Sequence, residues 1–172
     1  MPYWCARAAA GCPCRSLARV GISAHIARLR ASVGHDLLLV PSVTVLPFDE
    51  AGRVLLVRHA GHHDGWGVVG GAIEIGESPA QAAVREAGEE IGAEVRLVRL
   101  LDVLGGPDYQ VSYPNGDHTA YVTAVYAAEL AGGVLRPDGS EISGLAWFAR
   151  EELAGLALSR FARAVLLATR HL

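Results

Sequence analysis

The chain has 172 residues, of which 51% are hydrophobic, and it carries a formal net charge of −3 at pH 7. This length and composition favour one domain with a full core. The chain contains no uncharged apolar run of about 18 residues, so no membrane-spanning helix is predicted. All fifteen basic residues are arginine, which excludes Schiff-base catalysis and Walker-type phosphate loops, because both need a lysine.

The N-terminal part differs in charge from the rest of the chain. Residues 1–35 contain five arginines and no acidic residue, whereas the remaining residues contain ten arginines and eighteen acidic residues. Because an acidic body does not attract nucleic acid by itself, we expect no nucleic-acid partner. Arg7 and Arg15 interrupt the apolar core that a secretory signal would need. We predict a poorly structured tail over residues 1–20.

All three cysteines lie in this tail, at Cys5, Cys12 and Cys14. A zinc site is one interpretation, but no fourth ligand follows at tetrahedral spacing. Reduced thiols are the better interpretation, and they indicate a cytoplasmic protein.

An amphipathic helix is predicted within residues 21–35. Apolar residues recur there at helical spacing, at Ile22, Ile26, Leu29 and Val33. Their stripe would pack either on the main domain or on a second subunit, which would make the protein a homodimer.

The main domain is expected to span residues 36–172. Residues 37–48 form a β-rich segment in which Pro41 implies an edge strand or a break. A turn at residues 49–52 and a second strand over 53–58 complete a hairpin.

The loop that follows contains His59, His62, His63 and Asp64. These side chains could form a metal cluster, but we favour a solvated loop beside the active site, because the next segment supplies a metal site with oxygen ligands. Trp66, just after this loop, either belongs to the core or stacks on a base.

A short helix is predicted over residues 79–91. Ser78 can cap its first turn, Pro79 suits the first helical position, and Gln81 completes a capping box. Gly92 supplies the left-handed conformation that ends a helix.

This helix carries three carboxylates on one edge, at Glu86, Glu89 and Glu90. A separate apolar stripe is expected to be its buried side: Ala80, Val84, Ala87 and Ile91. Like charges at this spacing repel by a few tenths of a kcal/mol per pair. A hard divalent cation reverses that cost, because carboxylates, waters and substrate phosphates are the ligands of Mg2+.

Strands and helices alternate through the remaining residues. Strands are predicted over 94–104, 119–130 and 144–148, with turns at 105–108 and 113–117. Helices follow over 150–154 and 159–169, the second with Phe161, Val165, Leu166 and Leu167 facing inward. This order predicts an α/β fold with a mixed β-sheet between helical layers.

Residues 71–93 match the pattern G-x5-E-x7-R-E-U-x-E-E-x-G-U, where U is aliphatic. The matching positions are Gly71, Glu77, Arg85, Glu86, Ala87, Glu89, Glu90, Gly92 and Ala93. This segment resembles the Nudix box, which identifies the chain as similar to the Nudix hydrolases. Ala87 and Ala93 are smaller than the usual aliphatic residues, and Val69 stands where a proline often occurs.

The resemblance implies an α/β/α sandwich that cleaves the pyrophosphate bond of a nucleoside diphosphate linked to another moiety, with Mg2+ as cofactor and Mn2+ as a substitute. It implies metal ligands at Glu86, Glu89, Glu90 and the carbonyl of Gly70, with Glu77 supporting the metal site. Arg85 is expected to orient a carboxylate rather than to clamp the substrate.

The general base has two candidates, Glu90 of the box and Glu141. Glu141 lies in a late loop six residues before Trp147, a position that resembles the late-loop glutamate of MutT-like members. Asp138 is the alternative in the same loop.

The substrate within this class stays open. Pro107 has a spacing seen in ADP-ribose hydrolases, whereas Tyr109 lies where dinucleoside-polyphosphate members carry a tyrosine. We predict substrate contacts by four residues: Arg58, Trp66, Tyr109 and Asp117.

Two other functions were considered from the same residues. A non-catalytic sensor of ADP-ribose or another nucleotide is disfavoured by the complete box. An isopentenyl-diphosphate isomerase needs a catalytic cysteine in the domain, and residues 36–172 contain none.

Overall fold

The computed structural model describes residues 23–60 and 65–172. The elements in chain order are α1 (Ala24–Val33), β1 (Leu38–Phe48), β2 (Val54–His59), α2 (Pro79–Ile91), β3 (Ala93–Leu104), η1 (Pro107–Tyr109), β4 (Gln110–Ser112), β5 (His118–Gly133), β6 (Ile142–Phe148), α3 (Arg150–Leu153) and α4 (Arg160–Ala168). Within the two described ranges, no helix has the length and apolar character needed to cross a membrane. The predicted tail over 1–20 lies outside the described residues, as do His62, His63 and Asp64.

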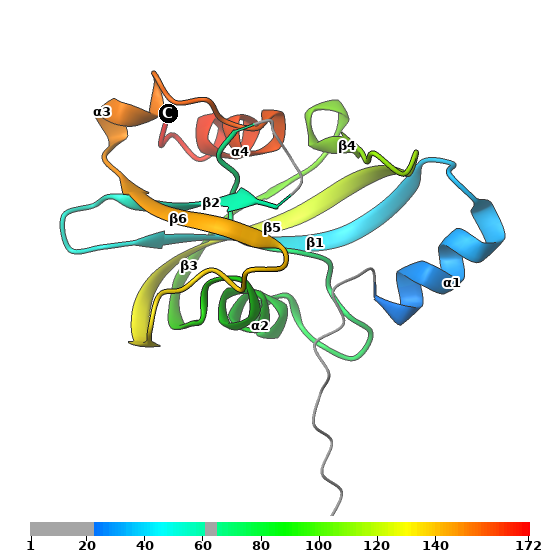
Figure 1. The fold of residues 1–172 in the computed structure, drawn as a ribbon, viewed down its shortest axis with the longest axis horizontal. Coiled ribbons are helices and arrows are strands. Elements are labelled where there is room, and N and C mark those ends of the chain that lie inside the picture. The colour runs from blue at the N-terminus through cyan, green and yellow to red at the C-terminus, as the bar shows by residue number, and fades with distance from the viewer. Residues whose placement is uncertain (1–22, 61–64) are drawn as a thin grey trace, which may run out of the picture.

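A mixed sheet forms the centre of the fold. Its strand order is β3-β5-β1-β2-β6, and β4 pairs with β5. β1 and β5 are parallel over the whole length of β1, and the other pairs are antiparallel. Figure 1 shows α2 on one face of the sheet and α3 and α4 on the other. Each face has its own apolar core, and the predicted α/β fold with helices on both sides is confirmed.

Pro41 does not mark an edge or a break, so that expectation was wrong. β1 lies between β5 and β2, and Pro41 is paired in register with Val122 of β5. On the opposite side of β1, Val43 donates to the Gly71 carbonyl and the Pro41 carbonyl accepts from Ile73. Because backbone groups alternate along a strand, the missing N–H of Pro41 faces this loop and no β1–β5 hydrogen bond is lost.

The N-terminal helix forms, and Ile26 and Leu29 of its predicted apolar stripe are half-buried, whereas Ile22 lies outside the described residues. α1 has no buried residue and lies beside the first residues of β1 (Figure 1). Its attachment is Arg30, whose guanidinium donates to the His118 carbonyl at 2.7 Å and the Thr119 hydroxyl at 3.0 Å and pairs with Asp117 at 3.6 Å. The helix is therefore held by a polar contact to the start of β5.

The last helix departs from its prediction at Leu167. Val165 and Leu166 are fully buried, whereas Leu167 is 54% exposed. At about 100° per residue, Leu167 points almost opposite to Val165, so the two cannot share the buried face.

Candidate active site

The start and end of α2 are as predicted. The Ser78 hydroxyl accepts from the Gln81 N–H at 3.3 Å, and the Gln81 side chain accepts from the Ser78 N–H at 2.8 Å. Pro79 occupies the first turn, and Gly92 ends the helix with φ of 67°. Local sequence signals thus determine where the carboxylate-bearing helix begins and ends.

The buried side of α2 differs from the predicted stripe. Ala80 is exposed and Val84 is 43% exposed, whereas the fully buried positions are Ala82, Ala83, Ala87, Glu90 and Ile91. The helix is rotated so that part of its carboxylate edge faces inward. The reason is the loop before the helix, which brings a backbone N–H to the Glu90 carboxylate.

Two glycines let this loop pass between β1 and α2. Gly70 has φ of 146°, and a Cβ there would lie 2.1 Å from the Val43 carbonyl oxygen. A Cβ on Gly71 would lie 2.4 Å from a carboxylate oxygen of Glu86. A side chain at Gly70 would displace the backbone of β1, so that position requires glycine, whereas a side chain at Gly71 would displace the Glu86 carboxylate.

Glu90 and Glu86 are buried carboxylates at this contact. Glu90 is 5% exposed, and its Oε2 accepts from the Gly70 N–H at 3.0 Å. Burial raises the pKa of Glu90, and the charges of Glu86 and Glu141 add to this despite the Gly70 hydrogen bond. Burial also raises the pKa of Glu86, against the opposing effect of Arg85. Two neighbouring carboxylates with raised pKa values mark a site that a cation would stabilise.

Arg85 organises the rest of the box. Its Nε and Nη2 donate to the two carboxylate oxygens of Glu77 at 3.1 and 2.6 Å. Its Nη1 donates to Glu86 at 2.8 Å and to Glu89 at 3.0 Å. Hydrogen bonding by Arg85 lowers the pKa of Glu77, so this carboxylate is charged and fully engaged. Glu77 thus contacts the site through Arg85, which has the geometry expected of an orienting residue.

The carboxylates open onto a cavity of about 910 Å³. Glu86, Glu89 and Glu90 line it from α2, and Glu141 lines it from the loop before β6. The negative charge of Glu141 contributes to the raised pKa of both Glu86 and Glu90.

Asp138, the alternative base, has a different position in that loop. It does not line the cavity, and its carboxylate accepts from the N–H groups of Ser140, Glu141 and Ile142. Although burial opposes it, hydrogen bonding from Ser140 and these N–H groups lowers the pKa of Asp138. Asp138 therefore shapes the loop that presents Glu141.

Of the four predicted substrate contacts, only Asp117 lines the cavity. Tyr109 is 7% exposed and packs edge-on against Phe161 in the core under α4. Trp66 packs against Phe148 at 4.9 Å between ring centroids, and the Arg58 guanidinium lies 4.7 Å from the Trp66 ring centre. Trp66 and Tyr109 thus pack against other aromatic side chains, Arg58 stacks on Trp66, and none of the three lines the cavity.

The cavity also has a wall that sequence reasoning missed. Arg30 of α1, Tyr113, Tyr121 and Phe161 line it, and the hydroxyls of Tyr113 and Tyr121 are 2.5 Å apart. The turn that contains Asp117 was the only sequence signal near this wall. Phe161 belongs to a helix far along the chain, and no local pattern connects it to the box.

The donor chemistry fits a hard divalent cation completed by further ligands. No three His, Cys, Asp or Glu side chains within residues 23–60 and 65–172 converge as a ready-made metal cluster. One carboxylate oxygen each of Glu86 and Glu90 accepts no hydrogen bond from the described residues. Mg2+ and Mn2+ take oxygen ligands and keep water or substrate oxygens, so an incomplete protein set is appropriate to them.

Comparison with known proteins agrees with this geometry. The family model described as the NUDIX domain matches residues 38–168. NAD-capped RNA hydrolase NudC of Vibrio atlanticus is 35% identical over 97 residues, which are 56% of this chain and 32% of that protein. RNA pyrophosphohydrolase of Teredinibacter turnerae is 39% identical over 66 residues, 38% of this chain and 39% of that protein. The chain thus spans about a third of the length of the NudC relatives it matches.

Solved structures show the same fold. A MutT NUDIX hydrolase from Burkholderia pseudomallei superposes with a TM-score of 0.59 at 26% identity, covering 78% of this chain and 98% of that one. A UDP-X diphosphatase superposes with a TM-score of 0.63 at 24% identity, covering 86% of this chain and 69% of the other. With the box at residues 71–93 and a matching domain over three quarters of its length, the chain belongs to the Nudix family.

Proposed function

We propose that this chain is a divalent-metal-dependent hydrolase that cleaves the pyrophosphate bond of a nucleoside diphosphate linked to another moiety. The observation that carries the proposal is the pair of buried carboxylates, Glu86 and Glu90, at the floor of an open cavity beside Gly70. A buried, mutually repelling pair is unfavourable in isolation, and it gains stability when a cation binds between it and an anionic substrate.

The residues have separable roles in this proposal. Glu86, Glu90 and the Gly70 carbonyl hold the metal, and Arg85 keeps Glu86 and Glu89 in position. When bound, Mg2+ or Mn2+ neutralises phosphate oxygens and acidifies a bound water. Glu141, which lines the same cavity, accepts the proton of the attacking water, with Glu90 as the second candidate base.

A nucleoside is the moiety that the cavity walls suit. Phe161, Tyr121 and Tyr113 offer aromatic surface across the cavity from the carboxylates. The names of the similar proteins include NAD-capped RNA and UDP-X as substrates. Both contain a pyrophosphate attached to a nucleoside, which supports the class and makes NAD-type dinucleotides the first to assay. We further propose that the substrate is a nucleotide-type small molecule, that the protein acts in the cytoplasm and that it forms a homodimer.

A substrate panel tests the proposal. Formation of the cleavage products is measured by chromatography, with Mg2+ and with Mn2+, for ADP-ribose, NADH, dinucleoside polyphosphates, oxidised and normal nucleoside triphosphates, and CoA. Glu90→Gln is expected to lose turnover by about a hundredfold or more, since it removes a metal ligand and a candidate base. Glu151→Gln, an exposed glutamate of α3 outside the cavity, is the matched control and should match wild type.

Two results would count against the proposal. One is full turnover by Glu90→Gln. The other is tight binding of ADP-ribose without hydrolysis of any compound in the panel, which would indicate a sensor instead.

A further inference from the structure

A second hollow, of about 500 Å³, lies away from the carboxylates on the side of the sheet covered by α3 and α4. Its charged lining comes from β3 (Arg99 and Asp102), from the start of α3 (Arg150) and from the residues after α4 (Arg170 and His171). We refer to it as the arginine hollow. None of these residues lines the carboxylate cavity.

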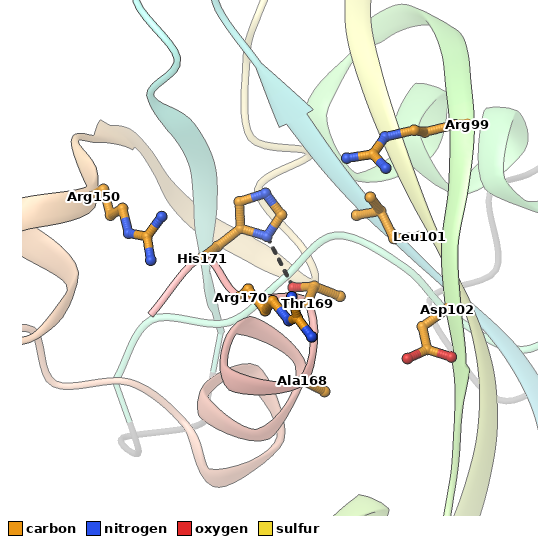
Figure 2. A pocket seen from close by; sticks show the side chains of 8 residues that line it. All are labelled: Arg99, Leu101, Asp102, Arg150, Ala168, Thr169, Arg170 and His171. Atoms are coloured by element: carbon orange, nitrogen blue, oxygen red, sulfur yellow. Dashed lines mark hydrogen bonds between the residues drawn. The ribbon is translucent and has the colours of Figure 1, made fainter.

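The arginine hollow gathers positive charge around His171. Figure 2 shows Arg99 and Arg150 on either side of the imidazole, with Arg170 close to Thr169 below it. Arg99, Arg150 and Arg170 line the same hollow as His171. A guanidinium group does not lose its proton in a protein, so this charge cannot be relieved by titration.

The arginines of the hollow lack carboxylate partners, as do some other described arginines, but these three are gathered around one hollow. Elsewhere, five arginines form ion pairs with Asp or Glu: Arg30, Arg53, Arg85, Arg96 and Arg160. Within the part of the chain that the structure describes, Arg99, Arg150 and Arg170 form no ion pair. Asp102 lines the same hollow, but its carboxylate accepts from the Val103 N–H and pairs with none of them. The hollow therefore has an excess of positive charge that an incoming anion would balance.

The neutral polar groups of the hollow are paired with one another and leave the guanidinium groups to bind the anion. The Thr169 hydroxyl donates to the Val165 carbonyl at 2.8 Å and lies 2.9 Å from His171 Nδ1, from which it accepts. Burial, with the charges of Arg150 and Arg99, lowers the pKa of His171. An anion in the hollow would reverse the effect of both arginines on this imidazole.

We propose that the arginine hollow binds a phosphate group, supplied either by free pyrophosphate or by a nucleotide. Planar guanidinium groups match phosphate oxygens bidentately, and a phosphate carries enough charge to balance more than one of them. The volume is within the range of small-molecule sites. The recognition is directed at the phosphate, because Leu101 and Ala168 are the only apolar residues of the lining.

Binding is tested by titration calorimetry with pyrophosphate, AMP and a short single-stranded RNA, on the full chain in EDTA. Without a divalent metal, the carboxylate cavity repels phosphate, so this test is independent of the proposed hydrolase activity. Arg99→Gln/Arg150→Gln is expected to weaken binding by about tenfold or more, because each substitution removes charge-assisted hydrogen bonds. Arg28→Gln/Arg163→Gln makes the same charge change at exposed positions outside both cavities and should stay within about twofold of wild type.

A second readout is the imidazole signal of His171 in NMR spectra. It should shift on saturation with pyrophosphate and titrate at higher pH in the complex, and its sensitivity to ligand should be lost in Arg99→Gln/Arg150→Gln. Equal affinity for pyrophosphate and AMP would assign the site to free phosphate species, whereas a preference for AMP would assign it to nucleotides. Binding of the RNA alone, or pyrophosphate binding that survives in Arg99→Gln/Arg150→Gln, would overturn the proposal.

Discussion

The carboxylate cavity gathers negative side chains and the arginine hollow gathers positive ones, and the two sets are distributed differently along the chain. Glu86, Glu89 and Glu90 lie within five positions of one helix, two of them largely buried, and Arg85 compensates part of their charge. The arginines of the hollow are exposed and come from three segments far apart in the chain. A site encoded by spacing on one helix is readable from sequence, whereas a site assembled by tertiary packing is not.

The largest expected effect on activity comes from replacing Glu141 in the carboxylate cavity. Glu141→Gln should lower kcat by about a hundredfold or more, because general bases contribute about 10²–10⁴. Single-turnover rates under saturating Mg2+ measure it, with Glu151→Gln as control. A decrease in kcat of only a few fold would indicate that Glu90, and not Glu141, is the general base.

Substitution of Arg85 tests whether the carboxylates of the box depend on the positive charge and the hydrogen bonds of this arginine. Arg85→Met should reduce activity by about ten- to a hundredfold, as expected for a residue that orients metal ligands. Arg85→Lys keeps the charge but cannot hold both Glu77 oxygens together with Glu86 and Glu89.

Activity as a function of Mg2+ concentration separates the two variants. We expect both to need more Mg2+, with the larger shift for Arg85→Met. Unchanged Mg2+ dependence in Arg85→Met would show that Arg85 does not position the metal ligands.

Arg30 lies at the far wall of the cavity, where one arginine is paired rather than clustered. Arg30→Gln removes the ion pair to Asp117 and weakens the attachment of α1. KM should rise several-fold with kcat nearly unchanged, because we expect this wall to contact the substrate away from the reacting bond. Faster amide exchange in α1 would accompany it, and a fall in kcat at constant KM would contradict this assignment.

The smallest expected effect is the pH dependence of the unfolding free energy. Its sign for Glu90 in the carboxylate cavity is opposite to its sign for His171 in the arginine hollow. Burial raises the pKa of Glu90 above its ordinary 4.5, so its stabilisation is present below 4.5 and is lost as pH rises through the folded-state pKa. Burial, Arg150 and Arg99 lower the pKa of His171 below 6.5, so its stabilisation is present above 6.5 and is lost as pH falls through its folded-state pKa.

Denaturant unfolding in EDTA across pH measures both contributions. Glu90→Gln should remove the decline in unfolding free energy above pH 4.5, and His171→Asn should remove the decline below pH 6.5. A pH profile that Glu90→Gln leaves unchanged would mean that Glu90 is not buried in the charged form at neutral pH.

The predictable part of the fold was the part set by local signals. Ser78, Gln81 and Gly92 determine α2 through hydrogen bonds within a few residues, and the turn at 113–117 joins β4 to β5 as predicted. The buried side of α2 was mispredicted because Gly70 attracts Glu90 inward from outside the helix. Pro41 was mispredicted because one side of β1 is hydrogen-bonded to the loop at residues 71–73. The rule that places proline at sheet edges considers only neighbouring strands.

The same distinction holds for the candidate site. Helical spacing predicted the shared edge of Glu86, Glu89 and Glu90, and the resemblance to the Nudix family pointed to their role and to Glu141; the structure brings all four to one cavity. Trp66 and Tyr109 were chosen by residue type and spacing along the chain, and packing against Phe148 and Phe161 takes them elsewhere. The wall that includes Arg30 and Phe161 depends on tertiary contacts, such as those of Arg30 with His118 and Thr119 and of Phe161 with Tyr121.

The central claim is that Glu86 and Glu90 hold a divalent cation. Mn2+ binding followed by electron paramagnetic resonance tests it directly, on wild type, Glu86→Gln/Glu90→Gln and Glu151→Gln. We predict saturable binding in wild type and Glu151→Gln that is lost in Glu86→Gln/Glu90→Gln. Mn2+ that binds the double variant as tightly as wild type would contradict the account.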